Sequence, residues 1–325
     1  MTEPSNTGDS HAPAISVVIP AYGVAGYIRE TVDTVLAQTF PDWELIVVND
    51  GSPDTRELEA ALASYRTRLT YLGQPNRGAA AARNAGILAA RGEWIAFLDG
   101  DDLWLPAYLE KQLGRLGRGD LDMVWCNGHV IDERGASRIM ATFPRRENVS
   151  AADLLREDVT VFTSATVVRR RSILEVGLFD ETLRRAQDYD LWVRLAFAGA
   201  RIGYQSVPLF KYRKRPGSLS GDALTDVRRS MVVYERLLEK LQGEPDLARI
   251  IREKLQTYRF RERVVLGKRA IEAGNYDEAR ACLRLASSVR LSWKVVATRG
   301  CLTLWPQAAR WMVHAWGKRR RERGS

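Results

Sequence analysis

Short apolar runs alternate with helix-patterned segments over residues 15–98, and this alternation constrains the fold more than any other feature of the chain. The runs are rich in β-branched residues and predict four buried strands, at residues 15–20, 44–48, 69–72 and 94–98. The segments between them predict helices at residues 27–38, 55–65 and 78–90. Strands that alternate with helices form βαβ units. We therefore expect an α/β fold with a mainly parallel sheet and helices on both of its faces.

Polar side chains follow three of the predicted strands directly. Tyr22 follows the first strand, Asp50 the second, and residues 99–102 (Asp-Gly-Asp-Asp) the fourth. Ligands of open α/β sheets bind outside the carboxyl ends of the strands, so these residues predict a single crevice. Three carboxylates within four residues repel one another unless a cation such as Mg²⁺ or Mn²⁺ neutralises them. The alternatives are a solvated turn or an N-cap for the helix expected at residues 105–116, for which Asp102 is the candidate.

The rest of the chain predicts more strands and then a change to helix. Strand patterns occur at residues 123–126, 165–169 and 203–212, and a helix pattern at residues 188–197. Beyond residue 222 every segment has helical character. We expect four parts: a disordered N-terminus (1–14), an α/β domain (15–221), a helical appendage (222–290) and a basic amphipathic tail (291–325).

The net charge of +9 belongs entirely to the end of the chain. Residues 284–325 hold ten Lys or Arg and one acid, and the other residues hold equal numbers of acids and bases. Four of the nine tryptophans lie in the same segment, and Leu302, Leu304 and Trp305 contribute to an apolar face. This pattern favours an anionic membrane surface as partner. The alternative is a terminal helix that packs on the α/β domain and has a solvated basic end. No nucleic-acid reading module is present, so we expect no nucleic-acid partner.

Targeting and redox features favour the cytoplasm. The start of the chain is polar and lacks the apolar stretch of a signal peptide. Cys126, Cys282 and Cys301 have neither a metal spacing nor an even count for disulfides. We expect a cytoplasmic protein that lies peripherally at the cytoplasmic face of the cell membrane.

Four motifs in sequence order carry a resemblance to a known family. They are SVVIPAYGVAGYIRETVDTVLAQTF (16–40), WELIVVNDGSPD (43–54), QPNRGAAAARNAGILAARGEWIAFLDGDDLW (74–104), and LFDETLRRAQDYDLWVRLAFAG (178–199) followed by KYRKRPGSLS (211–220). In order and spacing the chain resembles family 2 glycosyltransferases of the bacterial surface-glycan type. The resemblance implies the GT-A fold, which is Rossmann-like, and transfer with inversion.

The resemblance also implies a nucleotide site. Its residues are Pro20, Tyr22, Asp50, Gly78, Arg83, Asp99 and Gly100. Tyr22 would lie against the base, and Asp50 would accept the N3–H of uracil or thymine. Arg83 would reach the nucleotide from the alanine-rich helix. The alternatives are a core aromatic for Tyr22 and a turn aspartate for Asp50.

The chemistry implied by the resemblance depends on three carboxylates. Asp99 and Asp101 match the family's metal-binding pair, with Asp99 also directed at the ribose and the ion being Mg²⁺ or Mn²⁺. Asp188 matches the general base that takes the acceptor's hydroxyl proton. The alternative for Asp188 is an acid in the first turn of a helix, where it complements the dipole.

Two positions depart from the family pattern. Gln187 precedes the base where the family usually has Glu, and Arg215 stands where it often has a metal-ligating His. Arg213, Lys214 or Arg215 would then hold the diphosphate as charge-assisted donors.

We therefore expect an inverting enzyme that uses a UDP- or dTDP-sugar and a glycan or lipid-linked acceptor in surface polysaccharide or glycolipid synthesis. We expect loops between residues 100 and 190 to select the sugar, with Asn127, His129 and Thr163 as contributors. The alternative is a catalytically impaired regulatory or scaffold protein that binds nucleotide-sugars. A dinucleotide oxidoreductase is excluded because no Gly-x-Gly-x-x-Gly follows the first strand.

Overall fold

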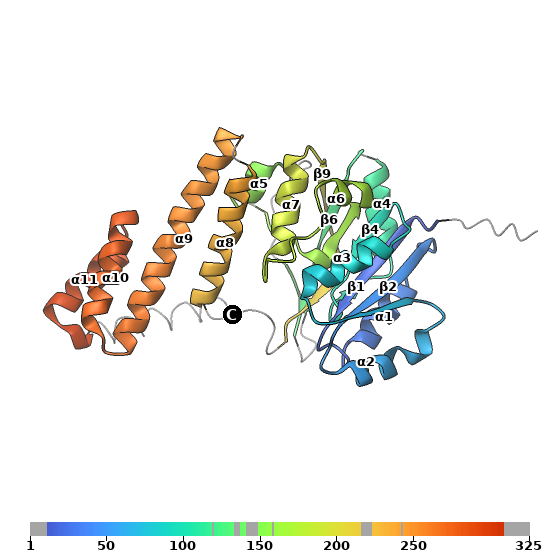
Figure 1. Cartoon of the computed structure of the whole chain (residues 1–325), viewed down its shortest axis with the longest axis horizontal. Coiled ribbons are helices and arrows are strands. Elements are labelled where there is room, and N and C mark those ends of the chain that lie inside the picture. The colour runs from blue at the N-terminus through green and yellow to red at the C-terminus, as the bar shows by residue number, and fades with distance from the viewer. Residues whose placement is uncertain are drawn as a thin grey trace, which may run out of the picture. The chain divides into compact units, whose positions relative to one another are not determined.

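The computed structural model divides the chain into two compact units, the first up to residue 218 and the second from residue 219. Figure 1 shows the order of their elements along the chain. The structure describes residues 12–118, 120–132, 137–140, 149–157, 159–215, 223–241 and 243–308. Our predictions for residues 1–11 of the N-terminus, for residues 216–220 of the last motif and for residues 309–325 of the tail lie outside the described residues.

In the described part of the chain, the first unit contains one nine-stranded sheet. Its strands are β1 (Ile15–Ala21), β2 (Trp43–Asp50), β3 (Thr70–Gln74), β4 (Trp94–Phe97), β5 (Leu103–Trp104), β6 (Met123–Ile131), β7 (Ser137–Ile139), β8 (Thr166–Arg169) and β9 (Ile202–Arg213). They lie in the order β3-β2-β1-β4-β8-β6-β9-β5, and β7 pairs with β6. The four strands predicted first are neighbours and parallel, and β6 is parallel to β9. β8, β5 and β7 run the other way, so the predicted mainly parallel α/β sheet is confirmed, with antiparallel pairs in its second half.

Successive side chains of each strand point to opposite faces of this sheet, so both faces carry apolar residues, and helices cover both. They are α1 (Ile28–Leu36), α2 (Thr55–Leu62), α3 (Ala79–Ala89), α4 (Tyr108–Gly117), α5 (Ala151–Leu155), α6 (Arg170–Glu175) and α7 (Gln187–Phe197), with single 3₁₀ turns η1 (Ala63–Tyr65) and η2 (Thr163–Ala165). Ile15, Val17 and Ile19 of β1 enter a core with α1, α2 and α4. Val18 points to the other face, where a Cβ on Gly86 of α3 would lie 2.3 Å from Val18 Cγ1. Glycine at this position therefore lets α3 lie close to the sheet.

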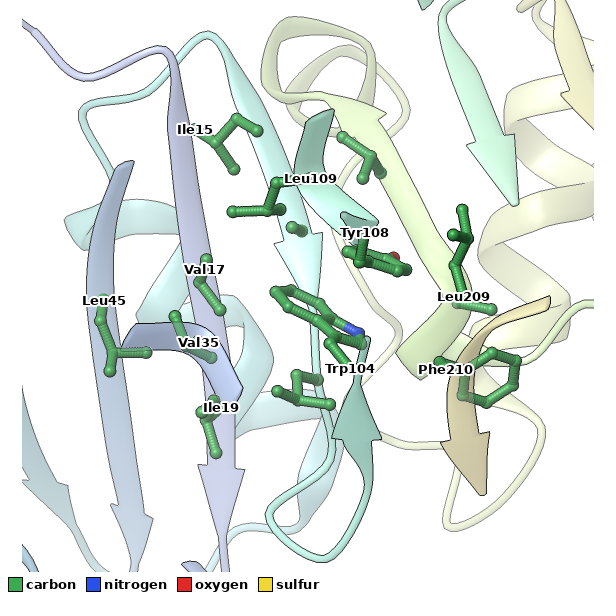
Figure 2. Close-up of a cluster of buried hydrophobic side chains, with 14 of the residues drawn as sticks. Ile15, Val17, Ile19, Val35, Leu45, Trp104, Tyr108, Leu109, Leu209 and Phe210 are labelled. Atoms are coloured by element: carbon green, nitrogen blue, oxygen red, sulfur yellow. The ribbon is translucent and has the colours of Figure 1, made fainter. Parts of the chain in front are cut away.

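The core on the first face continues from β1 to β9 (Figure 2). Trp104 and Tyr108 stack with ring centroids 4.0 Å apart, and Phe210 of β9 is fully buried. This core holds the antiparallel half of the sheet against the parallel half. Ser164, just before β8, and Arg213, at the end of β9, form hydrogen bonds with residues 99 and 102 after β4, so both halves contribute residues at the carboxyl end of β4.

The second unit is helical, with α8 (Ala223–Lys240), α9 (Pro245–Glu272), α10 (Tyr276–Val289) and α11 (Trp293–Leu304). Residues 273–275 turn the chain between α9 and α10, and Gly274 at φ +80° permits this turn. Its own core includes Ile271, Leu283 and Leu302. Leu302 is therefore buried, whereas Leu304 and Trp305 are exposed, so the expectation that these three residues share one apolar face was wrong. Leu302 packs inward from α11. In the described residues, no helix is long and apolar enough to cross a bilayer.

Candidate active site

Asp50 ends β2 and is only 3% exposed. Its Oδ1 accepts hydrogen bonds from Gln74 Nε2 (2.8 Å) and the Arg77 backbone N–H (2.9 Å), and its Oδ2 accepts one from the Gly78 N–H (2.7 Å). Gly78 has φ +93°, a backbone conformation that favours glycine. Asp50 thus shapes the loop between β3 and α3, which contains Gly78, one of the nucleotide residues that the resemblance implies.

Tyr22 follows β1 and is 50% exposed, so the alternative of a core aromatic is wrong. The turn after β2 binds the loop that follows Tyr22: Ser52 Oγ accepts from the Gly23 N–H (2.7 Å), and Asp54 Oδ2 accepts from the Ala25 N–H (2.9 Å). Burial opposes ionisation of Asp54, yet hydrogen bonds from Ser52 and these backbone amides lower its pKa. The turn residues after β2 therefore hold the loop that presents Tyr22.

Gly100 lies where three segments approach one another. A Cβ at this position would lie 2.9 Å from Val24 Cγ2 and 3.3 Å from the Pro20 carbonyl oxygen. The Gly100 carbonyl accepts a hydrogen bond from Thr31 Oγ1 of α1 (3.1 Å). The loop after β4 thereby packs directly against the end of β1.

Arg83 reaches the loop after β4 from α3. Its Nη2 lies 2.6 Å from Asp99 Oδ1, and its side chain is only 6% exposed. The guanidinium also lies over the ring of Phe179, 5.6 Å from its centroid. The structure therefore brings Arg83 and Asp99, both predicted nucleotide residues, into direct contact.

Asp101 pairs with Arg215, which departs from the family pattern. Arg215 Nε lies 2.7 Å from Asp101 Oδ2 without hydrogen-bond alignment, while its Nη1 donates to the Gly23 carbonyl (2.9 Å). Burial and the neighbouring charge of Asp99 raise the pKa of Asp101, whereas Arg215 and Arg213 oppose this rise. Arg215 therefore supplies positive charge where the family often has histidine.

The other two predicted diphosphate residues, Arg213 and Lys214, lie beside Arg215 at the end of β9. Arg213 Nε donates to the Asp101 carbonyl (2.9 Å), and its Nη2 donates to Glu30 (2.6 Å). The Lys214 side chain is exposed. Two of the three basic residues thus contact the loop after β4 directly.

Asp102 is buried and serves as an internal anchor. Its Oδ2 accepts from Ser164 Oγ (2.6 Å) and its Oδ1 from the Arg213 N–H (2.9 Å). Burial, together with the charges of Asp99 and Asp101, raises its pKa well above the ordinary value. The alternative of a helix cap is wrong, since Ala107 occupies that position of α4.

Asp188 lies in the first turn of α7, where the alternative of a helix-start acid places it and where the base interpretation also allows it. Thr163 Oγ1 donates to its Oδ2 (2.8 Å), and the Tyr189 N–H donates to its Oδ1 (2.8 Å). Ala186 before the helix adopts φ +53°, a left-handed conformation that is strained for a residue with a Cβ. Such strain is often found at functional sites.

Ser164 is a residue that the sequence analysis missed. It bonds to Asp102 and accepts from the Asp99 backbone N–H (3.1 Å), while its neighbour Thr163 bonds to Asp188. We call residues 99–102, which follow β4, the acidic loop. Consecutive residues of η2 therefore connect the acidic loop with the predicted base, Asp188. No local sequence signal marks this turn.

A second link joins α3 to the segment before α7. Asn84 Oδ1 accepts from the Phe179 N–H (3.0 Å), and its Nδ2 donates to the Phe179 carbonyl (2.9 Å) and to Glu181 (3.0 Å). Glu181 also pairs with Arg77 at 2.7 Å. Hydrogen bonds thus join α3, which carries Arg83, to the segment just before α7, which carries Asp188.

The acidic loop supplies only part of the ligands that a divalent cation needs. Among the described residues, no three His, Cys, Asp or Glu side chains are grouped for a metal ion. Asp99 and Asp101 each pair with one arginine, through one carboxylate oxygen. One or two carboxylates completed by water and substrate phosphates is the usual arrangement for Mg²⁺.

The parallel order β3-β2-β1-β4 and the acidic residues at the ends of β2 and β4 define an α/β protein with a ligand site at the carboxyl ends of its parallel strands. The chain belongs to glycosyl transferase family 2, whose model matches residues 16–178.

Relatives of known sequence agree with this assignment. The chain is 32% identical to the glycosyltransferase RP339 of Rickettsia prowazekii, with 72% of this chain and 74% of that protein covered. It is 32% identical to a Rickettsia bellii glycosyltransferase (71% of this chain) and 31% identical to the glycosyltransferase EpsJ of Bacillus subtilis (64% of this chain, 63% of that protein). The chain spans 34% of the length of the R. bellii protein.

Solved structures show the same fold. Residues 1–349 of Staphylococcus aureus TarS, in complex with UDP-GlcNAc, match with a TM-score of 0.62 at 19% identity, with 96% of this chain and 92% of that chain covered. The expected GT-A fold is therefore confirmed.

Proposed function

We propose that this chain transfers a sugar from a UDP- or dTDP-sugar to a hydroxyl group of a glycan or lipid-linked acceptor, with inversion, in surface polysaccharide or glycolipid synthesis. One observation carries the proposal. The adjacent residues Thr163 and Ser164 bond to Asp188 and Asp102, so the turn η2 links the predicted base to the acidic loop after β4. The family assignment and a TarS structure that contains UDP-GlcNAc support a nucleotide-sugar donor.

The donor's base and ribose would lie across the ends of β1 and β2. The exposed ring of Tyr22 offers a stacking surface. The Asp50 carboxylate accepts three hydrogen bonds, one from Gln74 at the end of β3 and two from backbone N–H groups of the loop that follows. With about four lone-pair positions it retains one for a uracil or thymine N3–H. Arg83 and Asp99 would then face the ribose and the first phosphate.

The diphosphate would lie between the acidic loop and the end of β9. Asp99 and Asp101 would hold Mg²⁺ or Mn²⁺, which when bound supplies Lewis-acid stabilisation to the leaving diphosphate. Arg213 and Arg215 would donate charge-assisted hydrogen bonds to phosphate oxygens. Arg215 would exchange its pairing with Asp101 for the diphosphate, because both groups compete for the same guanidinium.

Asp188 would act as the general base in a single displacement. Its carboxylate takes the proton of the acceptor hydroxyl as that oxygen bonds to the anomeric carbon. The bond from the same carbon to the diphosphate oxygen breaks on the opposite face, and the configuration inverts. Thr163 would orient the carboxylate for this transfer.

A second candidate is a nucleotide-sugar-binding regulatory protein without turnover. Gln187 and the pairing of Arg215 with Asp101 favour it, because both change groups that the family uses in catalysis. The two candidates share donor binding and differ in turnover.

The test combines a donor screen with Asp188→Asn. Among nucleotide-sugars, UDP- or dTDP-sugars should raise the thermal midpoint, since a ligand at a hundred times its Kd adds about 2.7 kcal/mol of stability. Asp188→Asn should keep this shift and lose transfer by on the order of 10²- to 10⁴-fold. Glu57→Gln is the matched control, because Glu57 is an exposed acid in the first turn of α2. Turnover by Asp188→Asn within a few-fold of the parent would reject Asp188 as base, and donor binding without any turnover by the parent would favour the regulatory candidate.

We also propose that the protein works peripherally at the cytoplasmic face of the membrane, where a lipid-linked acceptor would be presented. The support is the excess of basic residues and tryptophans at the end of the chain.

A further inference from the structure

Helix α11 carries apolar residues on two opposite faces. Val295, Thr298 and Leu302 point inward and are at most 5% exposed. The other face, at positions 293, 296, 297, 300 and 304, is spaced as one side of a helix and contains only Trp, Val, Ala, Gly and Leu. A surface helix ordinarily turns polar residues outward, so this outer face requires another explanation.

The outer face and its flanks are strongly exposed. Trp293 is 70% exposed and Leu304 is 87% exposed. Leu291 before the helix is 83% exposed, and Trp305 directly after it is 70% exposed. We call these four residues the α11 apolar surface. Exposed apolar residues gathered in this way mark an interaction site.

Charge identifies the partner of the α11 apolar surface. Residues 284–308 contain four bases and no acid. Arg284, Arg290 and Lys294 are exposed, and Lys294 Nζ lies 5.8 Å from the centroid of the Trp293 ring. Exposed cations interleaved with tryptophans match an anionic headgroup layer, in which indole rings prefer the interface.

The same charges disfavour two other occupants. A second copy docked symmetrically would bring identical cations together, because a twofold interface pairs the same patch on both subunits. Residues 309–325 hold six bases and one acid, so this segment would also place positive charge against positive charge.

We propose that the α11 apolar surface binds an anionic lipid bilayer, with the helix lying in the plane of the headgroups. At 12 residues the helix is about 18 Å long, well short of the roughly 30 Å hydrocarbon core, so it lies on the bilayer. This proposal refines the membrane location under the proposed function by naming the residues that make contact. The acceptor site itself plays no part in it.

The experiment measures co-sedimentation of the full chain with vesicles of phosphatidylcholine alone or with phosphatidylglycerol added. The triple variant Trp293→Ser, Leu304→Ser, Trp305→Ser should lose at least about tenfold in partitioning to anionic vesicles, and high salt should weaken the parent. The matched control is Leu174→Ser, Val207→Ser, Val232→Ser, which removes three exposed apolar side chains elsewhere and should bind as the parent does. Thermal midpoints check that both variants fold, and a chain ending at residue 308 should retain salt-sensitive binding.

Three outcomes would overturn the proposal. The parent remains in solution with anionic vesicles at low salt, the triple variant binds as the parent does, or the triple variant instead dissociates an oligomer in light scattering. Asp188→Asn should bind vesicles like the parent, and the triple variant should keep the donor-induced thermal shift. A failure here is thus distinguishable from a failure of the proposed transfer reaction.

Discussion

At the residue scale, Asp188 depends on a hydroxyl that reaches it from a different part of the chain. Thr163 donates at 2.8 Å to the oxygen that the Tyr189 amide leaves open. A carboxylate held by two directional donors has one orientation available. We regard Thr163 as a positioning residue for the proposed base.

Thr163→Val should therefore lower kcat roughly 10-fold or more while the Kd for the donor changes little, because this hydroxyl donates to Asp188, which is proposed to act on the acceptor. A large rise in the donor Kd would instead support the expected role of Thr163 in sugar selection. Thr163→Ser keeps the donor group and should restore most of the rate. Steady-state kinetics with a separate donor-binding measurement separates the two effects. If Thr163→Ser is as slow as Thr163→Val, the hydroxyl is not what positions Asp188.

The acidic loop makes a prediction about metal dependence. Asp101→Asn should weaken binding of UDP in Mn²⁺ by about 10-fold or more and have a much smaller effect in EDTA, because the amide is a poorer ligand for a hard cation. Isothermal titration measures both conditions. Asp120→Asn, at an acid whose side chain is 86% exposed, is the control. Equal UDP affinity for Asp101→Asn and the parent in Mn²⁺ would remove Asp101 from the metal site and leave Arg215 as the main charge on the diphosphate.

At the scale of elements, one side chain bonds across a pair of parallel strands and to the segment that leads into the next strand. Glu44 of β2 accepts hydrogen bonds from Ser16 Oγ of β1 (2.6 Å) and from the Arg91 N–H (2.7 Å), just before β4. Its second oxygen accepts from Arg91 Nε (3.0 Å). One carboxylate thus connects three neighbouring strands of the parallel half.

This contact predicts a pH-dependent stability. Burial alone would raise the pKa of Glu44, but the hydrogen bonds from Ser16 and Arg91 outweigh it and lower the pKa. Its stabilising effect is therefore present above the unfolded-state pKa of about 4.3 and is lost as pH falls through the lower folded-state value.

Glu44→Gln should lower the free energy of unfolding by about 1–2 kcal/mol at pH 7, and this difference should shrink as pH falls below about 4. Urea denaturation at a series of pH values measures it. Glu57→Gln, at an exposed acid, should stay within about 0.5 kcal/mol of the parent throughout. A deficit for Glu44→Gln that is the same at every pH would mean that packing, and not charge, is responsible.

At the scale of the whole molecule, each of the two units has a core of its own. In the first unit a hydrophobic cluster lies along one face of the sheet and further buried residues such as Val18 and Phe97 lie on the other, whereas the core of the second unit lies among α9, α10 and α11. Leu283 is 2% exposed in the second core, where its Cδ2 would lie 2.9 Å from a Cβ on Gly267. The helical unit therefore has the means to hold its structure independently of the donor site.

Leu283→Ala should destabilise the helical unit by about 2–5 kcal/mol through the cavity it creates, and leave the Kd for the donor unchanged. Hydrogen exchange along α9 and α10, measured beside donor binding, checks both statements. Leu285→Ala is the control, since Leu285 is on the same helix and half exposed. A loss of donor affinity in Leu283→Ala would show that the helical unit supports the site.

Much of the fold and part of the site could be predicted from the sequence. Residues 15–98 predicted four strands and three helices, and β1 to β4 with α1 to α3 confirm them. The polar residues after β1, β2 and β4, including Tyr22 and Asp50, were correctly assigned to one edge of the sheet. These features depend on periods of two and 3.6 residues and on strand ends, which are local properties of the chain.

The contacts between distant segments were decided only by the tertiary structure. Asp102 and Arg213 lie 111 residues apart, and their hydrogen bond exists because β5 pairs with β9. The turn η2 has no pattern of its own in the sequence, yet its Ser164 bonds to Asp99 and its Thr163 bonds to Asp188. Leu302 and Leu304 are chemically alike and two residues apart, yet one is buried and the other is 87% exposed, because the packing of α11 on α10 selects the inward face. Local periodicity gives an element and its faces, whereas the partner of each face depends on how the whole chain packs.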